Sequence, residues 1–211
     1  MSAFARDMDA GRSPCDDRGV GDRDPSNGYE RIAPDFIASR SGVGAGVVAA
    51  WAKALPAAAA IVDLGCGRGV PISETLVDAG FQVFGVDASP TMVAAFRARF
   101  PELAVQCAAA EDADFFGRRF DGIVAWGLMF LLDADTQRRL IAKMAGALRT
   151  GGSLLFTAPR AACSWRDIMT GQTSISLGVD EYRRQLEAGG LTLIGSETDE
   201  GENHYYLTVK R

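Results

Sequence analysis

The sequence has few of the residues that form metal or nucleic-acid sites. Its 211 residues contain a single histidine, His204, and four cysteines that show neither C-x-x-C pairing nor metal-ligand spacing. Zinc sites need clustered Cys and His ligands, so we expect no metal ion. No lysine- or arginine-rich run is present and the net charge is −5, which argues against a nucleic-acid partner or an anionic membrane surface.

Long apolar runs are also absent. The longest ones fall far short of the roughly 20 residues that cross a bilayer, so we expect no membrane span. No secretory-type apolar segment follows Met1, and the cysteines show no pairing pattern, so we expect a cytoplasmic location. With 47% apolar and 23% charged residues, the chain has the composition of a globular protein.

The composition changes near Tyr29. Residues 1–26 mix Asp, Arg, Gly, Pro and Ser with few large apolar groups, and we expect this segment to be disordered. Residues 27–211 are expected to form one domain. This domain begins with a helical cap, residues 27–56, in which apolar residues recur at helical spacing.

Strand-like and helix-like segments alternate after the cap. The expected strands are 59–64, 81–86, 103–107, 120–126, 153–158, 191–197 and 204–209, and the expected helices are 70–79, 90–100, 134–148 and 179–188. This alternation predicts an α/β fold with a mostly parallel sheet and helices on both faces. Only about six residues separate the last two strands, too few for a parallel crossover, so we expect an antiparallel hairpin. Residues 159–178 are expected to form a loop.

The most informative motif is a glycine-rich turn after the first strand. Residues 61–71 read IVDLGCGRGVP, with Asp63 just before the first glycine. In open α/β sheets, ligands bind outside the carboxyl ends of the strands, and glycines there let the backbone approach a ligand closely. The alternative is a plain tight turn between a strand and a helix, because such a turn alone is weak support for a ligand site.

A second carboxylate, Asp87, ends the neighbouring strand. Asp87 can accept hydrogen bonds from both hydroxyls of a ribose, whereas Asp63 would repel a pyrophosphate and favour an ammonium group. Val70 stands where a dinucleotide-binding fingerprint has Gly or Ala. The other interpretation of Asp87 is a helix N-cap, a role that Ser89 suits better. Two carboxylates around a turn with few side chains suit S-adenosylmethionine, a positively charged nucleoside cofactor.

This series of motifs resembles the class I S-adenosylmethionine-dependent methyltransferases of the small-molecule type. The resemblance spans about residues 29–211 and rests on VDLGCGRG (62–69), VFGVDAS (83–89), AAAED (108–112), FDGIVAW (120–126) and LRTGGSLLFTAP (148–159). It implies a Rossmann-like, seven-stranded sheet with strand order 3-2-1-4-5-7-6 and the last strand antiparallel. The hairpin inferred from the residues agrees with that topology.

The resemblance implies S-adenosylmethionine as cofactor, S-adenosylhomocysteine as its product, and no metal. It places these residues at the cofactor: Tyr29, Arg40, Asp63, Gly65, Cys66, Gly67, Asp87, Ala88, Ala110, Glu111 and Trp126. Asp63 would lie by the methionine part, and Ala110 and Glu111 by the adenine edge. Relatives often carry an aspartate near Ala108, so backbone groups are expected to recognise the adenine here. Arg40 could equally be a solvated arginine at a helix end.

Apolar residues follow the fourth strand, where relatives often contact the methyl acceptor. Residues 127–132 read GLMFLL and lack the Asn/Asp-Pro-Pro-aromatic motif common in amino-methyltransferases of nucleic acids and proteins. An apolar wall that includes Met129 and Phe130 suits a small organic acceptor, with core packing as the alternative role. Trp165, in the expected loop 159–178, is predicted to cover this substrate.

The only histidine starts the last strand. Because this strand is antiparallel, its beginning lies at the carboxyl edge of the parallel strands, so Asn203 and Tyr205 are predicted to contact the acceptor. A neutral imidazole can take a proton from a hydroxyl, thiol or amine near pH 7, so His204 is the candidate general base. A structural role is the alternative. Side chains alternate along a strand, so at most one of Tyr205 and Tyr206 faces the site.

The sequence therefore predicts a cytoplasmic enzyme, monomeric or homodimeric, that transfers a methyl group from S-adenosylmethionine to a small organic acceptor by in-line displacement. One alternative is a non-catalytic S-adenosylmethionine-binding regulator or partner subunit. Another is a nicotinamide-dependent oxidoreductase, against which Val70 and Asp63 argue. An RNA or protein methyltransferase is a third, and the acidic charge and the missing proline motif disfavour it.

Overall fold

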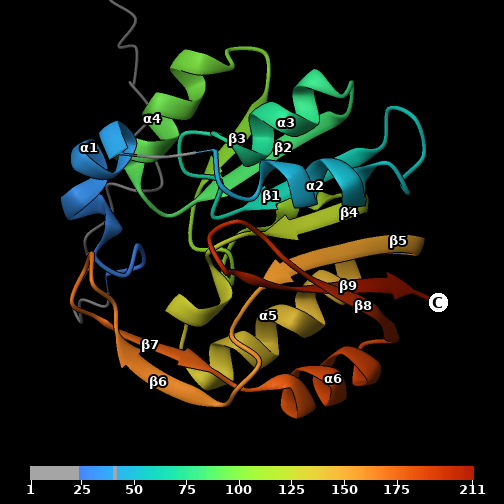
Figure 1. The fold of residues 1–211 in the computed structure, drawn as a ribbon. Coiled ribbons are helices and arrows are strands. Elements are labelled where there is room, and N and C mark those ends of the chain that lie inside the picture. The colour runs from blue at the N-terminus through green and yellow to red at the C-terminus, as the bar shows by residue number, and fades with distance from the viewer. Residues whose placement is uncertain (1–23, 40–41) are drawn as a thin grey trace, which may run out of the picture.

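The computed structural model describes residues 24–39 and 42–211, which include a seven-stranded sheet (Figure 1). Its strands are β1 (Ala60–Leu64), β2 (Gln82–Asp87), β3 (Ala104–Cys107), β4 (Phe120–Ala125), β5 (Leu148–Thr157), β8 (Leu191–Thr198) and β9 (His204–Lys210). They lie in the order β3-β2-β1-β4-β5-β9-β8. β9 is antiparallel to both neighbours and the other pairs are parallel. The predicted order 3-2-1-4-5-7-6 is confirmed, because β8 and β9 are the sixth and seventh strands of this sheet along the chain.

Helices cover both faces of the sheet. They are α1 (Tyr29–Ser39), α2 (Ala45–Ala52), α3 (Ile72–Asp78), α4 (Pro90–Arg99), α5 (Ala134–Ala147) and α6 (Val179–Ala188). Figure 1 shows α2, α3 and α4 on one side of the sheet and α5 and α6 on the other. Successive residues of β1 serve the two sides, since Ile61 packs in the core with α2 and α3 while Val62 packs in the core with α5.

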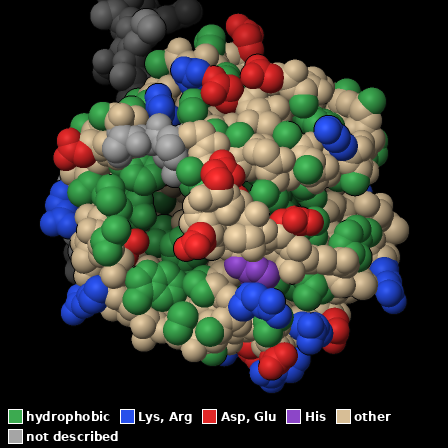
Figure 2. Space-filling view, in the orientation of Figure 1, with side chains coloured by type: hydrophobic (Ala, Val, Ile, Leu, Met, Phe, Trp, Pro, Cys, Tyr) green, Lys and Arg blue, Asp and Glu red, His purple; other side chains and the backbone are tan. Residues whose placement is uncertain are grey.

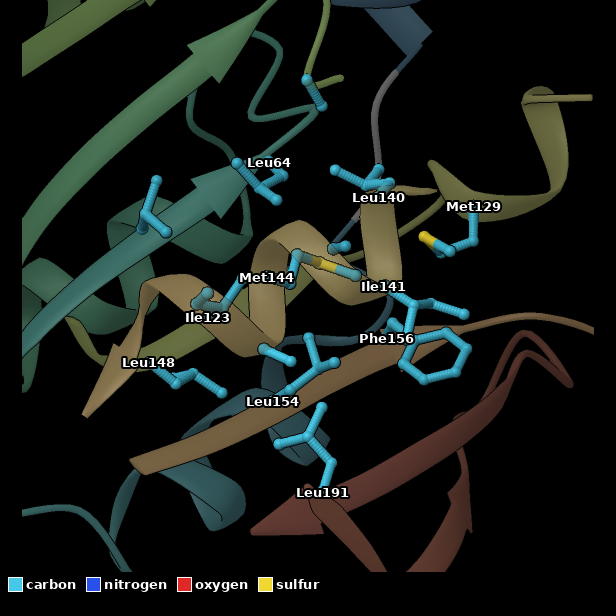
Figure 3. Close-up of a cluster of buried hydrophobic side chains, with 14 of the residues drawn as sticks. Leu64, Ile123, Met129, Leu140, Ile141, Met144, Leu148, Leu154, Phe156 and Leu191 are labelled. Atoms are coloured by element: carbon cyan, nitrogen blue, oxygen red, sulfur yellow. The ribbon is translucent and has the colours of Figure 1, made fainter. Parts of the chain in front are cut away.

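The larger core lies between α5 and the sheet (Figure 3). Leu140, Ile141 and Met144 fall on one face of α5 because they are three or four residues apart. They pack in one cluster with strand residues such as Leu154 and Phe156 of β5, and all five side chains are fully buried. Burial of side chains of this size stabilises the fold by about 1.5–3 kcal/mol each. The core thereby fixes the strands whose carboxyl ends form the site.

α1 docks on the beginning of α4 through Glu30. The Glu30 carboxylate accepts hydrogen bonds from the Thr91 backbone N–H (3.1 Å), the Thr91 hydroxyl (2.7 Å) and the Ser89 hydroxyl. Unpaired N–H groups and the helix dipole favour a carboxylate at this position. Ser89 caps α4 by accepting from the Met92 N–H at 3.1 Å, and Pro90 occupies the first turn, as the sequence predicts. The cap is therefore held beside the carboxyl end of β2.

The expected loop 159–178 contains an antiparallel hairpin, β6 (Cys163–Arg166) and β7 (Thr173–Ser176), so that prediction was wrong. Each strand has four residues and β6 is largely exposed, so no alternating apolar pattern marks either one. Buried Gln137 of α5 ties the hairpin to the domain. Its amide N–H₂ donates to the carbonyl oxygens of Ile175 and Leu132, both at 2.9 Å, and its amide oxygen accepts from the Tyr182 hydroxyl at 2.6 Å.

The segment expected to be disordered, residues 1–26, lies almost wholly outside the described residues. Its last residues belong to a turn in which the Asp24 carboxylate accepts from the N–H groups of Ser26 (2.9 Å) and Gly28 (2.8 Å). This turn leads directly into α1. Within the described ranges, no helix combines the length and the apolar character that a membrane crossing requires.

The Gln137 contacts predict a large effect of one substitution. We expect Gln137→Leu to lower the free energy of unfolding by about 2–4 kcal/mol, because two buried carbonyl groups and a hydroxyl lose their partner. Tyr182→Phe removes a single hydroxyl from the same network and should lower it by about 1 kcal/mol. Urea denaturation measures both variants, and a Gln137→Leu variant as stable as the unsubstituted protein would contradict this account.

Candidate functional site

A cavity of about 220 Å³ opens at the carboxyl edge of the parallel strands. Its walls come from the turns after β1, β2 and β4, from α1, and from the residue just before β9. Figure 2 shows hydrophobic side chains gathered around a hollow on this side of the molecule. The structure places these predicted site residues on its lining: Tyr29, Asp63, Gly65, Cys66, Gly67, Asp87, Ala88, Ala110, Glu111, Trp126, Phe130 and Asn203.

The glycine-rich turn lies against the end of β2. The N–H groups of Gly65 and Cys66 both donate to the Val86 carbonyl oxygen, at 2.8 and 3.1 Å. Gly69 has φ +83°, and a Cβ at this position would come within 2.6 Å of the Phe100 ring. Only glycine fits there, because a side chain would be strained by the backbone and blocked by the ring. The turn is therefore kept close to β2.

Asp87 joins this turn to α4. One carboxylate oxygen accepts from the Gly67 N–H at 2.8 Å and the other from the Ser89 N–H at 2.8 Å. Burial raises the pKa of Asp87 to about 6, against the effect of these two hydrogen bonds, and the Glu30 charge adds to the rise. A carboxylate that is costly to ionise on a cavity wall is a candidate ligand-binding group.

Opposite charges lie around the turn. Asp63 is 1% exposed and accepts a hydrogen bond from the Ser73 hydroxyl at 2.7 Å. Arg68 also lines the cavity, and its Nε–H is buried with no hydrogen-bond partner among the described residues. A buried unpaired N–H is costly, which favours a ligand that accepts from it. Burial and the charges of Asp87 and Asp63 raise the pKa of the Cys66 thiol, which makes it a neutral packing group.

The segment after β3 forms another wall of the cavity. Ala109 and Ala110 are buried there, and their small side chains leave space beside Asp87. Lys143 of α5 fixes this segment, because its Nζ donates to the carbonyl oxygens of Ala110 (3.2 Å) and Glu111 (2.6 Å). The backbone of this segment is therefore held in place by a side chain of α5.

The start of β9 contributes Asn203, which is held by a charged network. Its Nδ2 donates to both carboxylate oxygens of Asp199, each at 3.0 Å, and the Tyr205 hydroxyl donates to Asp199 at 2.7 Å. Burial tends to raise the pKa of Asp199, but hydrogen bonds from Asn203 and Tyr205 hold it below its usual value. The ionised carboxylate therefore sets the position of Asn203.

The same network meets the cap at Gly44. Gly44 has φ +91°, and a Cβ there would lie 2.6 Å from the Tyr205 hydroxyl and 2.7 Å from the Trp126 indole nitrogen. The Glu200 carboxylate accepts from the Gly44 N–H at 3.3 Å. The cap, the end of β4 and the start of β9 therefore approach one another so closely that only glycine fits between them.

Residues 61–152 match the family model described as a methyltransferase domain. Over this range the chain is similar to methyltransferase domains. The matched range includes the glycine-rich turn, Asp87 and the end of β4, and it confirms the resemblance stated from the sequence motifs. A search of curated proteins found no match.

Solved methyltransferase structures share the fold of this domain. CalS10, an amino pentose methyltransferase from Micromonospora echinaspora with SAM bound, has a TM-score of 0.68 at 19% identity over 86% of this chain and 96% of that chain. The Burkholderia thailandensis 1,6-didemethyltoxoflavin-N1-methyltransferase, with 1,6-didemethyltoxoflavin and S-adenosylhomocysteine bound, has a TM-score of 0.69 at 18% identity. The match covers 87% of this chain and 84% of that chain. Magnesium protoporphyrin IX methyltransferase from Synechocystis PCC 6803, with SAM bound, has a TM-score of 0.70 at 17% identity. The match covers 92% of this chain and 100% of that chain.

Some residues that were predicted to contact the acceptor are absent from the lining that the described residues form. Met129 is fully buried in the core, and Tyr205 is fully buried with its hydroxyl on Asp199. Trp165 packs against Phe130, with ring centroids 5.6 Å apart, so it supports a lining residue from the hairpin. Sequence reasoning placed these side chains near the correct edge of the sheet, but their faces depend on packing.

His204 lies outside that lining as well. Its half-buried ring packs edge-on against the Tyr206 ring, with centroids 4.8 Å apart. Burial and the positive charge of Arg160 lower the pKa of His204, so its imidazole is neutral near pH 7. Arg40, which the resemblance placed at the cofactor, lies outside the described residues.

Several lining residues were missed from the sequence: Asn27, Phe36, Ile37, Arg68 and Met92. Arg68 lies inside the glycine-rich motif, so a charged residue in that turn was an available signal. Phe36 shares a helix face with Tyr29, and their rings meet at 5.3 Å. Nothing in the sequence shows which face of α1 turns toward the cavity. In the described part of the chain, no His, Cys, Asp and Glu side chains gather into a group that could hold a metal ion.

Asp199 should stabilise the folded protein in a pH-dependent way. We expect Asp199→Asn to lower the free energy of unfolding by about 1–3 kcal/mol at pH 7, because hydrogen bonds to a charged group are weakened. The depressed pKa means that this contribution is present above the ordinary aspartate pKa and is lost as the pH falls through the folded-state value.

The difference between the variant and the unsubstituted protein should therefore shrink between about pH 5 and pH 3. Thermal unfolding over this range measures it. Asp180→Asn, at an exposed position on α6, is the matched control and should leave stability nearly unchanged. A difference that does not depend on pH would contradict the charged network.

Proposed function

We propose that the protein transfers a methyl group from S-adenosylmethionine to a small organic acceptor. The observation that carries the proposal is Asp87, a carboxylate on the cavity wall whose pKa is raised to about 6 by burial. It ends β2, where ligands of open α/β sheets bind. The methyltransferase match over residues 61–152 and the solved neighbours with SAM or S-adenosylhomocysteine bound support the same reading.

The described residues fit the parts of this cofactor. Asp87 would accept hydrogen bonds from the ribose hydroxyls. The Asp63 carboxylate suits the ammonium group of the methionine part, and the unpaired Nε–H of Arg68 suits its carboxylate. Ala88 and Ala110 leave room for the adenine, whose recognition would then rest on backbone groups that Lys143 helps to hold.

The chain's own contribution would be alignment and exclusion of water. S-adenosylmethionine supplies an electrophilic methyl group when bound, so the protein has to place an acceptor in line at near-attack distance. Trp126, Leu128 and Phe130 give the cavity an apolar wall suited to a small organic molecule. The general-base role of His204 stays a prediction, and its place outside the described lining lends it no support.

The acceptor class and the location of the protein remain part of this proposal. The net charge of −5 and the apolar wall favour a small acceptor over a nucleic acid. We propose a cytoplasmic location. We propose a monomer or a homodimer as the working form.

Calorimetric titration with S-adenosylhomocysteine tests the cofactor assignment. We expect micromolar binding and no binding of NAD. Asp87→Ala should weaken S-adenosylhomocysteine by at least about 50-fold, because a charged acceptor of two ribose hydrogen bonds is lost. Asp180→Ala, which removes an exposed carboxylate from α6, is the control and should bind as tightly as the unsubstituted protein.

The same titration has a pH dependence. With a pKa of about 6, Asp87 gains a proton as the pH falls from about 7 to 5, so affinity for S-adenosylhomocysteine should fall over this range. Asp87→Ala should not show this decline. Binding that is unchanged in Asp87→Ala, or no binding in the unsubstituted protein, would overturn the proposed function.

A further inference from the structure

The contacts of Asn203 settle which way its amide faces. Nδ2 lies 3.0 Å from each carboxylate oxygen of Asp199. An amide oxygen in that place would face a carboxylate, and two acceptors with negative charge repel each other. The nitrogen therefore faces Asp199, and the oxygen lies at the other end of the planar amide group.

Asp199 holds this orientation firmly. Its carboxylate also accepts from the Tyr205 hydroxyl at 2.7 Å and from the N–H groups of Gly201 (2.9 Å) and Asn203 (3.0 Å). Asp199 is 7% exposed and Tyr205 is fully buried. Turning the Asn203 amide over would break two hydrogen bonds to a charged group and set its oxygen against that charge. The amide is thus fixed before any ligand enters.

The Asn203 oxygen is left free to serve a ligand. Asn203 lines the cavity, and within the described ranges its amide oxygen accepts no hydrogen bond. The lining residues from the segment after β4 are apolar on this side, as Leu128, Phe130 and Leu131 show. A fixed polar atom on an apolar wall orients a bound small molecule and sets specificity.

We propose that the Asn203 amide oxygen accepts a hydrogen bond from the N–H of a neutral amine, and that this amine is the methyl acceptor. The inference rests on the proposed function and adds the class of acceptor to it. Asn203 would contact the substrate directly, and Asp199 and Tyr205 would be positioning residues that act through it.

An amine is favoured because an amide oxygen can accept a hydrogen bond but is too weak a base to deprotonate the acceptor. A hydroxyl or thiol acceptor needs a base to become a good nucleophile, whereas a neutral amine attacks with its own lone pair. The described lining residues after β4 and before β9 include neither a carboxylate nor an imidazole, since His204 packs against Tyr206 instead. The carboxylates of the lining come from another part of the sheet edge: Asp63 from β1, Asp87 from the end of β2 and Glu111 from the segment after β3.

The transfer balances without a base in the protein. The amine lone pair forms the N–CH₃ bond while the S–CH₃ bond breaks, and the electron pair of that bond stays on sulfur as a thioether. The product is an ammonium ion, which then loses a proton to water. During attack the hydrogen bond to Asn203 would hold one N–H aside so that the lone pair points along the line of transfer.

Matched aromatic amines test the hydrogen bond without knowledge of the natural acceptor. The protein is saturated with S-adenosylhomocysteine and titrated with aniline and with N,N-dimethylaniline, which has no N–H, by ligand-observed NMR. We expect aniline to bind about tenfold more tightly than N,N-dimethylaniline, as one hydrogen bond would give. Asn203→Leu, of similar size, should remove this preference and leave S-adenosylhomocysteine affinity within about twofold of the unsubstituted protein.

The comparison in the unsubstituted protein needs no variant, so the test survives if Asn203→Leu does not fold. Equal binding of the two amines, absence of aniline binding, or a preference that persists in Asn203→Leu would overturn the inference. A transfer assay with labelled S-adenosylmethionine adds the chemistry, since aniline should be methylated and phenol should not. Methylation of phenol alone would overturn the amine assignment, whereas failure of S-adenosylhomocysteine to bind would overturn the proposed function instead.

Discussion

The site depends on one pair of hydrogen bonds, from the Gly67 and Ser89 N–H groups to Asp87. They join the turn after β1 to the beginning of α4, and Ser89 continues the chain of contacts to Glu30 of the cap. Burial disfavours the ionised form of Asp87. Its pKa of about 6 means that the Asp87 carboxyl group holds its proton more tightly in the folded protein than in the unfolded chain. The contribution of Asp87 to stability therefore declines as the pH rises through about 6. A ligand with hydroxyl donors would offset that cost.

The cavity has two halves with different chemistry. The half built by the ends of β1, β2 and β3 is charged, with Asp63, Arg68 and Asp87 on its lining. The half built by the end of β4 and the start of β9 is apolar apart from a few fixed groups such as Asn203. The first half suits a zwitterionic nucleoside and the second an organic acceptor. Gly44 lets the cap approach Tyr205 and Trp126, since a Cβ there would lie within 2.6 Å of the Tyr205 hydroxyl.

Much of the fold could be predicted because its signals are local. The alternation of strands and helices sets the layers, and the short link before β9 makes the last strand antiparallel. The charged half of the cavity could also be predicted, since Asp63 lies near the end of β1, Asp87 ends β2, and the glycines lie between them in the chain. What the sequence did not show are features that depend on packing. The β6–β7 hairpin has no apolar pattern and is held by Gln137 from a distant helix.

The apolar half of the cavity was predicted only to the level of a segment. Asn203 and His204 are neighbours in the chain, but Asn203, just before β9, lines the cavity while His204, the first residue of β9, packs against Tyr206. The sequence places both at the correct edge and cannot tell which one faces inward. Arg68 lies in the glycine-rich motif, so its charge was visible in the sequence. Only the structure shows that its Nε–H is buried and unpaired among the described residues, which makes it a candidate ligand-binding group.

A crystal structure of the complex with S-adenosylhomocysteine tests the central claim most directly. The account predicts the ribose hydroxyls within hydrogen-bond distance of the Asp87 carboxylate, with the amino-acid end of the ligand between Asp63 and Arg68. A ligand bound elsewhere, or one whose ribose does not touch Asp87, would contradict it.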